Sequence, residues 1–265
     1  MAFVTARMQS SERNTPIFLY ITLWLLVWLH VLRGVITLLT LFPFLNTNTK
    51  KYHIQRWSKR LLKIFGIRLQ VNNAVALPDS SYLLAANHVS WMDIHAINAF
   101  KPIRFVAKSE VERWPIFGWM AKQLDTVFIN RESSRHARQV VVDMAELLKT
   151  QSICIFPEGT STIGKNIQTF KSNLFEAASQ AEVPVCTLAI AYFDRNTGKH
   201  SEVPAFVGDM GLIGSMARIL KNRSLQVELT LFLPVNTKSV QPIDRKVLAL
   251  HSQEQIAKYL AKHCN

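Results

Sequence analysis

A histidine and a carboxylate stand five residues apart in the segment AANHVSWMDIHA, which covers residues 85–96. On one continuous helix His88 and Asp93 would face different sides, because five residues correspond to about 500° of rotation. If His88 lies instead on a turn between a strand and a helix, Asp93 in the first helical turns can reach its ring. A histidine held by a carboxylate can act as a general base. We therefore expect His88 to be the catalytic base and Asp93 its partner; a core histidine beside an unrelated aspartate is the alternative.

No serine nucleophile accompanies this pair. The sequence contains no GxSxG elbow, and Ser90 is better suited to cap the helix that follows. His95 competes as the base, but it is only two residues from Asp93 and would point elsewhere on the helix. We expect His88 to deprotonate a substrate hydroxyl that attacks an activated acyl group directly, without a covalent enzyme intermediate.

Further polar side chains follow apolar runs that have the character of strands. Lys108 ends the run in RFVAKSE, and Arg131 follows the run in FINRE. A cation at either place can bind an anionic substrate group. In IFPEGTST, Gly159 permits a close approach of the backbone, and the Glu158 carboxylate can accept from a polyol hydroxyl. We expect these residues, with Thr160, to bind substrate; surface ion pairs and an ordinary turn are the plainer alternatives.

Strand-like and helix-like segments alternate after residue 66. The expected strands cover residues 67–71, 82–86, 104–107, 126–129, 152–156, 185–192 and 225–233, and the expected helices cover 90–100, 133–150, 173–181 and 243–263. This alternation predicts an α/β fold with a mostly parallel central sheet flanked by helices. Because ligands gather at the carboxyl ends of strands in such sheets, the polar clusters are expected to meet at that edge.

An apolar segment precedes this alternation. Residues 16–45 read PIFLYITLWLLVWLHVLRGVITLLTLFPFL, with no charged side chain before Arg33. Arg33 and Gly34 interrupt the run, and Pro43 disfavours a helix at its end. One arrangement is a single spanning helix near residues 16–34 with the remainder at the interface; the other is a helical hairpin within one leaflet. Basic flanks favour the hairpin, with both ends on the cytoplasmic side, and no small-residue site for signal-peptide cleavage follows the run.

Charge marks the same end of the chain. The net charge is +13, and residues 1–72 carry +9 of it. Residues 50–66 place their apolar side chains at helical spacing, with the basic residues largely off this stripe, which predicts a basic amphipathic helix. This helix can pack on the catalytic domain with its basic face in solvent, or it can contact the membrane, which the neighbouring apolar run favours. We therefore expect a membrane-anchoring element at residues 1–66, a catalytic domain at residues 67–265, and an anionic membrane surface as a partner.

Composition excludes several classes of protein. The chain has 265 residues, of which 49% are hydrophobic, with 10 prolines and 9 glycines, so it can bury a full core and is neither disordered nor collagen-like. Three scattered cysteines without zinc spacing argue against a disulfide framework and a structural zinc, and we expect Cys154 and Cys186 in the core. The basic excess lies beside the apolar segment, and no nucleic-acid-binding module is recognised, so no nucleic acid is expected as a partner.

Four blocks occur in the order NHVSWMD, FINR, FPEGTS and VPVCTLAI, and together they resemble the acylglycerol-phosphate acyltransferase family, of the bacterial lysophosphatidic acid acyltransferase type. The resemblance implies that His88 is the base and Asp93 its partner. It also implies that Arg131 binds the phosphate-bearing head of the acceptor and that Glu158 and Gly159 shape the acceptor site. An acyl thioester on coenzyme A or acyl carrier protein would be the donor, with no metal or other cofactor. The enzyme would belong to the bacterial inner membrane, its catalytic domain on the cytoplasmic side.

The third block departs from the family at one place. Many members have an arginine after EGT, where this chain has Ser161 and Thr162. One phosphate-binding cation is therefore missing, unless Lys108, Lys165 or Lys171 replaces it. We expect 1-acylglycerol 3-phosphate as the lysolipid acceptor, giving phosphatidic acid. Acylation of lyso-ornithine lipid, whose head carries no phosphate, is the first alternative, and a non-catalytic lipid-binding protein on the same scaffold is the second.

Overall fold

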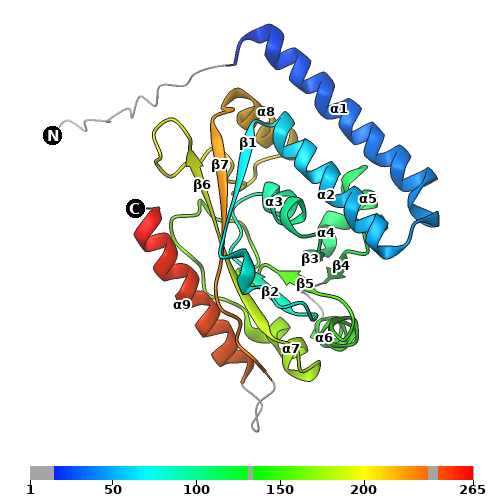
Figure 1. The fold of residues 1–265 in the computed structure, drawn as a ribbon, viewed down its shortest axis with the longest axis vertical. Helices are drawn as coiled ribbons and strands as arrows, with labels where there is room; N and C mark the ends of the chain where they lie inside the picture. Colours follow the sequence, from blue (N-terminus) through cyan, green and yellow to red (C-terminus); the bar gives the residue numbers. More distant parts are fainter. Residues whose placement is uncertain (1–14, 131–133, 238–243, 265) are drawn as a thin grey trace, which may run out of the picture.

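A seven-stranded sheet forms the centre of the molecule in the computed structural model, which describes residues 15–130, 134–237 and 244–264 (Figure 1). The strands are β1 Ile67–Asn72, β2 Leu83–Ala86, β3 Arg104–Lys108, β4 Val127–Ile129, β5 Ile153–Ile155, β6 Val185–Asp194 and β7 Leu225–Leu231. Their order across the sheet is β1-β7-β6-β2-β5-β3-β4. Only β6 and β7 pair antiparallel among these strands, so β1 and β7 run opposite to the other five. The predicted α/β fold with a mostly parallel sheet is confirmed.

The register of the sheet brings the expected site segments together. Leu83 of β2 pairs with Ile153 of β5 and with Val185 of β6, all in parallel. The chain therefore leaves β2 and β5 side by side at the carboxyl edge, where a crevice forms in sheets of this kind. The loop after β5 then crosses the loop after β2, because the backbone N–H of Thr162 donates to the carbonyl of His88 at 2.9 Å.

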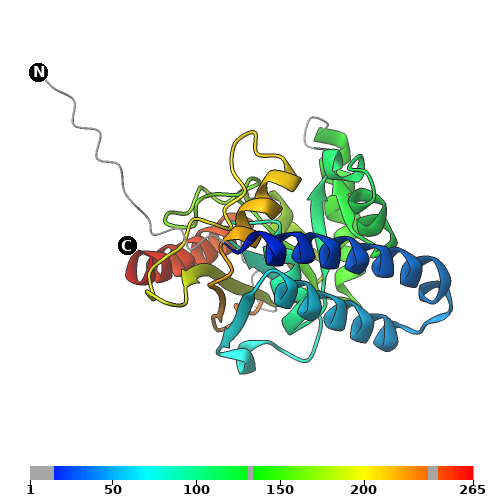
Figure 2. The same ribbon diagram turned by 90° about the horizontal axis from the view of Figure 1, so that it is seen from above.

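Helices cover both faces of the sheet. The helices are α1 Ile17–Thr40, α2 Thr47–Ile64, α3 Met92–Phe100, α4 Ser109–Glu112, α5 Phe117–Gln123, α6 Ser134–Leu148, α7 Glu176–Gln180, α8 Leu212–Lys221 and α9 Arg245–His263. One cluster of buried apolar side chains joins α1, α2, α3 and α8 to one face, and a second joins α6, α7 and α9 to the other. Figures 1 and 2 show the resulting three layers. Cys154 and Cys186 are fully buried in this core, as predicted.

The observed helices differ from the expected ones in two ways. α3 begins at Met92 rather than at Ser90, although Ser90 Oγ still accepts from the backbone N–H of Met92 at 3.2 Å. α8 and the short α4 and α5 were not predicted. Gly214 weakens the helical pattern of α8, but burial of its apolar face, including Met216, outweighs the low helix propensity of this glycine.

The N-terminal apolar segment forms one long helix. α1 passes through Arg33 and Gly34 without a break, so the expected interruption at this pair is wrong. The turn comes later, at a 3₁₀ turn over Phe42–Phe44, and Asn46 then caps α2 by accepting from the N–H of Thr49 at 3.0 Å. α2 returns beside α1 (Figures 1 and 2), so the predicted amphipathic helix is the second arm of a helical hairpin.

Gly34 serves close helix packing rather than a turn. A Cβ at this position would lie 2.8 Å from Trp57 Nε1 on α2. Trp57 Nε1 donates to the carbonyl of His30 at 3.2 Å, and the His30 ring forms a hydrogen bond of 3.0 Å with the carbonyl of Trp57. The two rings stack with 4.6 Å between their centroids. The two arms of the hairpin are therefore joined at the level of His30, Gly34 and Trp57.

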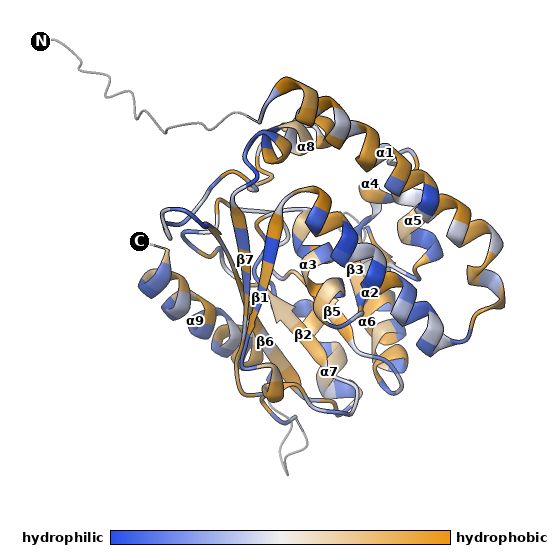
Figure 3. Cartoon of the chain, turned by 45° about the horizontal axis from the view of Figure 1, so that its top comes forward, coloured by the Kyte–Doolittle hydropathy of each residue, from blue (hydrophilic) through white to orange (hydrophobic). Residues whose placement is uncertain are grey.

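The outer side of α1 is apolar and uncovered. Within the described residues, α1 is the one helix long and apolar enough to cross a bilayer. Figure 3 shows that α1 consists mainly of hydrophobic residues. Its inner side is buried against the core, whereas its outer side exposes large apolar side chains throughout its length. Phe18 is 83% exposed, and Ile21, Leu25, Leu29 and Leu32 are each more than half exposed. An uncovered apolar stripe of this length is typical of contact with a membrane or a partner.

Candidate functional site

His88 lies on a turn between the end of β2 and the start of α3, as the spacing predicted. Asn87 fixes the end of β2, because its Nδ2 donates to the carbonyl of Ile190 at 2.9 Å and its Oδ1 accepts from the N–H of Ile190 at 2.7 Å. The side-chain amide thus continues the pairing of β2 with β6 beyond the last residue of the strand. From the other side, the ring of Phe156 stacks on the His88 ring with 4.1 Å between centroids.

Asp93 holds the ring and closes the turn. It is fully buried, and its Oδ2 lies 2.8 Å from His88 Nδ1. The same oxygen accepts from the backbone N–H groups of Val89 and Ser90 at 2.7 Å and 2.9 Å. Because an ionised carboxylate only accepts, Nδ1 carries the ring proton and Nε2 of the neutral ring keeps a lone pair. None of the described residues forms a hydrogen bond with Nε2, and the side chain is 21% exposed, so the lone pair is available to a substrate.

Tyr192 on β6 is a positioning residue that the sequence analysis missed. Its hydroxyl donates to Asp93 Oδ1 at 2.7 Å, and both side chains are fully buried. Burial, with the neighbouring Asp93 carboxylate, raises the pKa of Tyr192 well above its usual value, so the hydroxyl keeps its proton. The residue stands two places after the block VPVCTLAI, where a strand in the core was the expected role.

Glu158 lies behind the site rather than in its wall. It is 3% exposed, and its Oε1 accepts from the backbone N–H of His88 at 2.8 Å while Oε2 accepts from the N–H of Gln168 at 2.9 Å. Burial raises the pKa of Glu158, although both N–H groups oppose this. In this structure the carboxylate therefore ties the His88 turn to the loop after β5, and a contact with a polyol hydroxyl stays a prediction.

His95 is a poor competitor for the role of base. It lies inside α3 beside Trp57 and Trp91, with ring centroids 5.3 Å and 5.8 Å away. Burial lowers the pKa of His95 to about 3. Among the described residues its Nδ1 has no hydrogen-bond partner. His95 is therefore neutral at pH 7 and lacks the carboxylate partner that holds the ring of His88.

A cavity of about 610 Å³ opens beside His88. Most of its wall is apolar and comes from α1, α2, α3, β3 and α5, with Leu38, Trp57, Ile94 and Phe117 among the contributors. The hairpin is therefore part of the site, since α1 and α2 supply one side of this wall. A cavity of this size and polarity can enclose a long apolar substrate group beside the histidine.

Three of the predicted substrate-binding residues share this cavity with His88, namely Lys108, Gly159 and Thr160. Lys108 is exposed at the end of β3. Arg131 lies outside the described residues. Lys165, considered as a substitute for the missing arginine, instead pairs with Glu202 at 2.6 Å.

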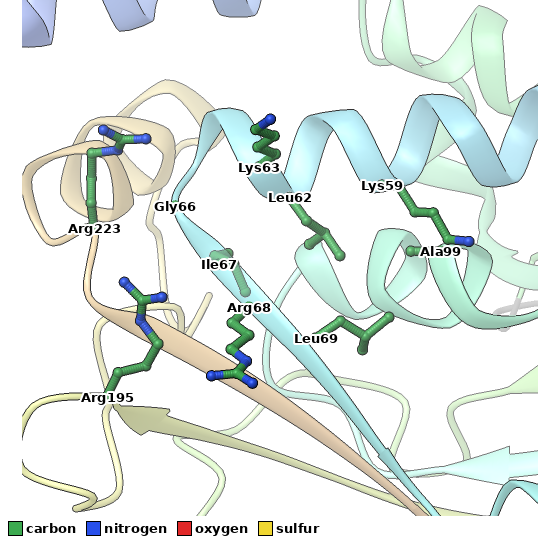
Figure 4. Close-up of a pocket in the computed structure, with 10 residues that line it drawn as sticks. All are labelled: Lys59, Leu62, Lys63, Gly66, Ile67, Arg68, Leu69, Ala99, Arg195 and Arg223. Carbon is green, nitrogen blue, oxygen red and sulfur yellow. The ribbon is translucent and has the colours of Figure 1, made fainter.

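A second, more open pocket of about 480 Å³ lies between α2, β1 and the start of β7. Its described lining includes five cations and no carboxylate, as Figure 4 shows: Lys59, Lys63, Arg68, Arg195 and Arg223. It shares no residue with the cavity at His88.

Comparison with known proteins gives consistent results. The model of the family described as Acyltransferase matches residues 68–191. The chain is 34% identical to lyso-ornithine lipid O-acyltransferase of Pseudomonas aeruginosa over 201 residues, which cover 76% of this chain and 75% of the relative. It is 36% identical to 1-acyl-sn-glycerol-3-phosphate acyltransferase of Neisseria gonorrhoeae over 172 residues, which cover 64% of this chain and 67% of that protein.

A solved structure with the same fold is among the matches. The 1-acyl-sn-glycerophosphate (LPA) acyltransferase PlsC from Thermotoga maritima matches with a TM-score of 0.64 and covers 92% of this chain and 96% of its own. Its sequence identity to this chain is 22%. The likeness therefore extends over the hairpin, the sheet and the helices on both faces.

Proposed function

This chain belongs to the acyltransferase family, and we propose that it transfers a fatty acyl group from a thioester to the free hydroxyl of 1-acylglycerol 3-phosphate, which gives phosphatidic acid. The observation that carries the proposal is the 2.8 Å hydrogen bond between His88 Nδ1 and Asp93, which leaves the lone pair of Nε2 beside an apolar cavity. A base in such surroundings suits a substrate with a hydroxyl next to a long acyl chain.

The reaction proceeds through a direct attack. Nε2 of His88 takes the proton of the acceptor hydroxyl as the oxygen bonds to the thioester carbonyl carbon. The tetrahedral intermediate then expels the thiolate, and the imidazolium returns the proton to sulfur. Asp93 stabilises the imidazolium through Nδ1 and keeps the ring in the orientation that this transfer needs. No bond between the enzyme and the acyl group forms.

The remaining residues act on the substrates. Lys108 and Arg131 attract the phosphate-bearing head, and Gly159 and Thr160 form the wall against which the acceptor lies. The Glu158 carboxylate holds the His88 turn by accepting a hydrogen bond from the backbone N–H of His88. The donor is an acyl thioester on coenzyme A or acyl carrier protein, and the step needs no metal or other cofactor.

The hairpin brings the site to the lipid. Residues 1–66 act as the anchor and residues 67–265 as the catalytic domain, with α1 resting its uncovered apolar side in the membrane. The excess of basic residues at this end favours an anionic surface such as the cytoplasmic leaflet of a bacterial inner membrane. A lysolipid can then reach His88 from the bilayer, because α1 and α2 also form a wall of the cavity.

Acylation of lyso-ornithine lipid is the second candidate. It is favoured by the likeness to a lyso-ornithine lipid O-acyltransferase and by Ser161 and Thr162, which stand where many members carry an arginine. Both candidates use the same base and the same donor, so only the acceptor distinguishes them.

The deciding experiment is acyl transfer by the detergent-purified protein. Lysophosphatidic acid and lyso-ornithine lipid are offered side by side with acyl-coenzyme A, and thiol release and lipid product are followed. We expect turnover on lysophosphatidic acid and a loss of about 10²–10⁴-fold in His88→Ala. His251→Ala, on the exposed side of α9, is the matched control and should keep full activity.

Each other outcome has a clear meaning. Turnover on lyso-ornithine lipid alone selects the second candidate. Full activity of His88→Ala overturns the mechanism. Bound thioester without thiol release, on either acceptor, points to a non-catalytic lipid-binding protein.

A further inference from the structure

Three arginines of the hairpin lie in the wall of the cavity that contains His88. Arg33 comes from α1, and Arg56 and Arg60 come from α2. The α1–α2 contact at Gly34 and Trp57 brings them to one level, because Arg33 precedes Gly34 and the other two flank Trp57. None of the three belongs to the four sequence blocks, so the sequence analysis assigned none of them to a substrate site.

Within the part of the chain that the structure describes, no carboxylate pairs with these arginines. The described lining of the cavity contains no Asp or Glu, and no described ion pair involves any of the three. Arg56 and Arg60 are four residues apart on one helix, where like charges are destabilising. Burial, with the Arg33 and Arg56 guanidinium groups, lowers the pKa of Arg60, so the charges oppose one another.

One hydrogen bond orients Arg56 in the cavity wall. Arg56 Nη1 donates to the hydroxyl of Tyr52 at 2.8 Å, and Tyr52 lines the same cavity. Arg33 is also the one formally charged residue of α1, the helix whose outer side is uncovered and apolar. A charged side chain in such a helix is costly, and the cost points to a function.

We propose that Arg33, Arg56 and Arg60 form a binding site for a substrate phosphate in the reaction cavity. The proposal rests on the proposed function. A phosphate oxyanion would neutralise three guanidinium groups that otherwise repel one another, and guanidinium forks bind phosphate through paired hydrogen bonds. The site would supply the charge that is missing after the EGT sequence.

The position of the missing arginine supports this assignment. Ser161 there donates its hydroxyl to the carbonyl of Phe206, and the N–H of Thr162 donates to the carbonyl of His88. Both residues are thus engaged within the protein. Lys165 is paired with Glu202 and does not line the cavity. Beside Lys108, the three hairpin arginines supply the positive charge of the described cavity wall.

The phosphate has two possible sources. The acceptor carries a phosphate monoester if it is lysophosphatidic acid, and the donor carries phosphate groups on coenzyme A or on the pantetheine arm of acyl carrier protein. Both present the same oxyanion to arginine. The acceptor is the source we expect, because the arginines belong to the hairpin that faces the lipid.

The first test is steady-state kinetics in detergent. Arg33→Gln, Arg56→Gln and Arg60→Gln are each expected to raise the KM for lysophosphatidic acid roughly tenfold to a hundredfold, with kcat nearly unchanged. Arg60→Lys should keep part of the affinity, because the charge remains while the fork is lost. The matched controls are Lys59→Gln and Lys63→Gln, which remove the same charge from the same helix but face the pocket of Figure 4.

The second test separates this proposal from the catalytic one. Binding of labelled lysophosphatidic acid and of labelled acyl-coenzyme A is measured in the His88→Ala background, with and without each arginine. Weaker binding of lysophosphatidic acid supports the acceptor as the source, and weaker binding of acyl-coenzyme A assigns the site to the donor. Unchanged binding of both overturns the proposal, even if catalysis by His88 stands. Arginine-dependent binding without turnover in the wild type would leave the phosphate site standing and overturn the proposed function.

Discussion

Two concave regions of this molecule carry groups of cations, and only one of them contains a base. The cavity at His88 combines three hairpin arginines with an apolar wall and a histidine whose Nδ1 is fixed by Asp93. The pocket of Figure 4 has five cations around Gly66 and Ile67 but no histidine and no carboxylate in its described lining. Positive charge alone therefore does not identify the reaction site. A buried hydrogen-bond network beside an apolar cavity is the better indicator of the reaction site, because it holds a titratable side chain in the one orientation that catalysis needs.

The hydrogen-bond network around Asp93 is present in the cavity and absent from the described lining of the pocket, and breaking it should reduce activity the most. Asp93→Asn keeps the shape of the side chain but can present a donor to Nδ1, which moves the ring proton to Nε2 where the base needs a lone pair. We expect kcat to fall by about 10²–10⁴-fold. Thiol release under saturating substrates measures this. Asp143→Asn on α6 is the control, and equal activity of both variants would contradict the role of Asp93.

The hairpin wall is the second difference, since α1 lines the cavity and not the pocket. Gly34→Ala would bring a Cβ within 2.8 Å of Trp57 Nε1, so α1 must shift, at a cost of about 1–3 kcal/mol in the free energy of unfolding. Gly214→Ala on α8 meets open space and should be neutral or slightly stabilising. Thermal unfolding of the two variants in detergent gives the comparison. Equal melting temperatures would show that α1 does not pack as described.

A half-buried histidine, His95, gives the cavity region its own pH dependence. The unfolded chain protonates His95 near pH 6.5, whereas burial lowers the pKa of His95 to about 3 in the folded protein. Between these values the unfolded state binds more protons, so stability is present above pH 6.5 and is lost as the pH falls. From pH 7.5 to pH 5 the loss from this residue is roughly 2 kcal/mol.

Denaturant unfolding at the two pH values measures that loss. His95→Phe should reduce the difference by the same amount, and His251→Phe, on the exposed side of α9, should leave it unchanged. A difference that survives in His95→Phe would assign the acid sensitivity to other groups.

The second support of Asp93 should affect kcat much less than Asp93 itself. Tyr192→Phe removes the hydroxyl that donates to Asp93 Oδ1 at 2.7 Å and leaves the ring packing intact. We expect a loss of about 1–3 kcal/mol in stability and a fall in kcat of roughly tenfold or less, because the remaining bonds still hold Asp93. Tyr259→Phe is the control, as its hydroxyl contacts Glu228 at 3.3 Å on the far side of the sheet from the hairpin. A loss of kcat as large as in Asp93→Asn would mean that Tyr192 takes part in the reaction itself.

The turn that carries His88 was predictable because its signal is local. The five-residue spacing to Asp93 excluded a shared helix face, and an apolar run ended at Asn87, so a strand-to-helix turn was the arrangement that could join the two. The hairpin turn was not predictable in the same way. Arg33 and Gly34 have the composition of a break, yet the glycine is there for the contact with Trp57, which lies on another helix.

The alternating strands and helices, the His88–Asp93 pair and the apolar N-terminal helix could be predicted from the chain alone, because periodicity and short spacing express them directly. The distant groups that support the pair, and the cations that share its cavity, became apparent in the folded molecule. Tyr192 reaches Asp93 across 99 residues, and the hairpin arginines reach the cavity through the packing of α1 and α2 against the domain. Such contacts depend on how the layers pack, and the packing free energy is shared among many side chains rather than expressed in any one motif.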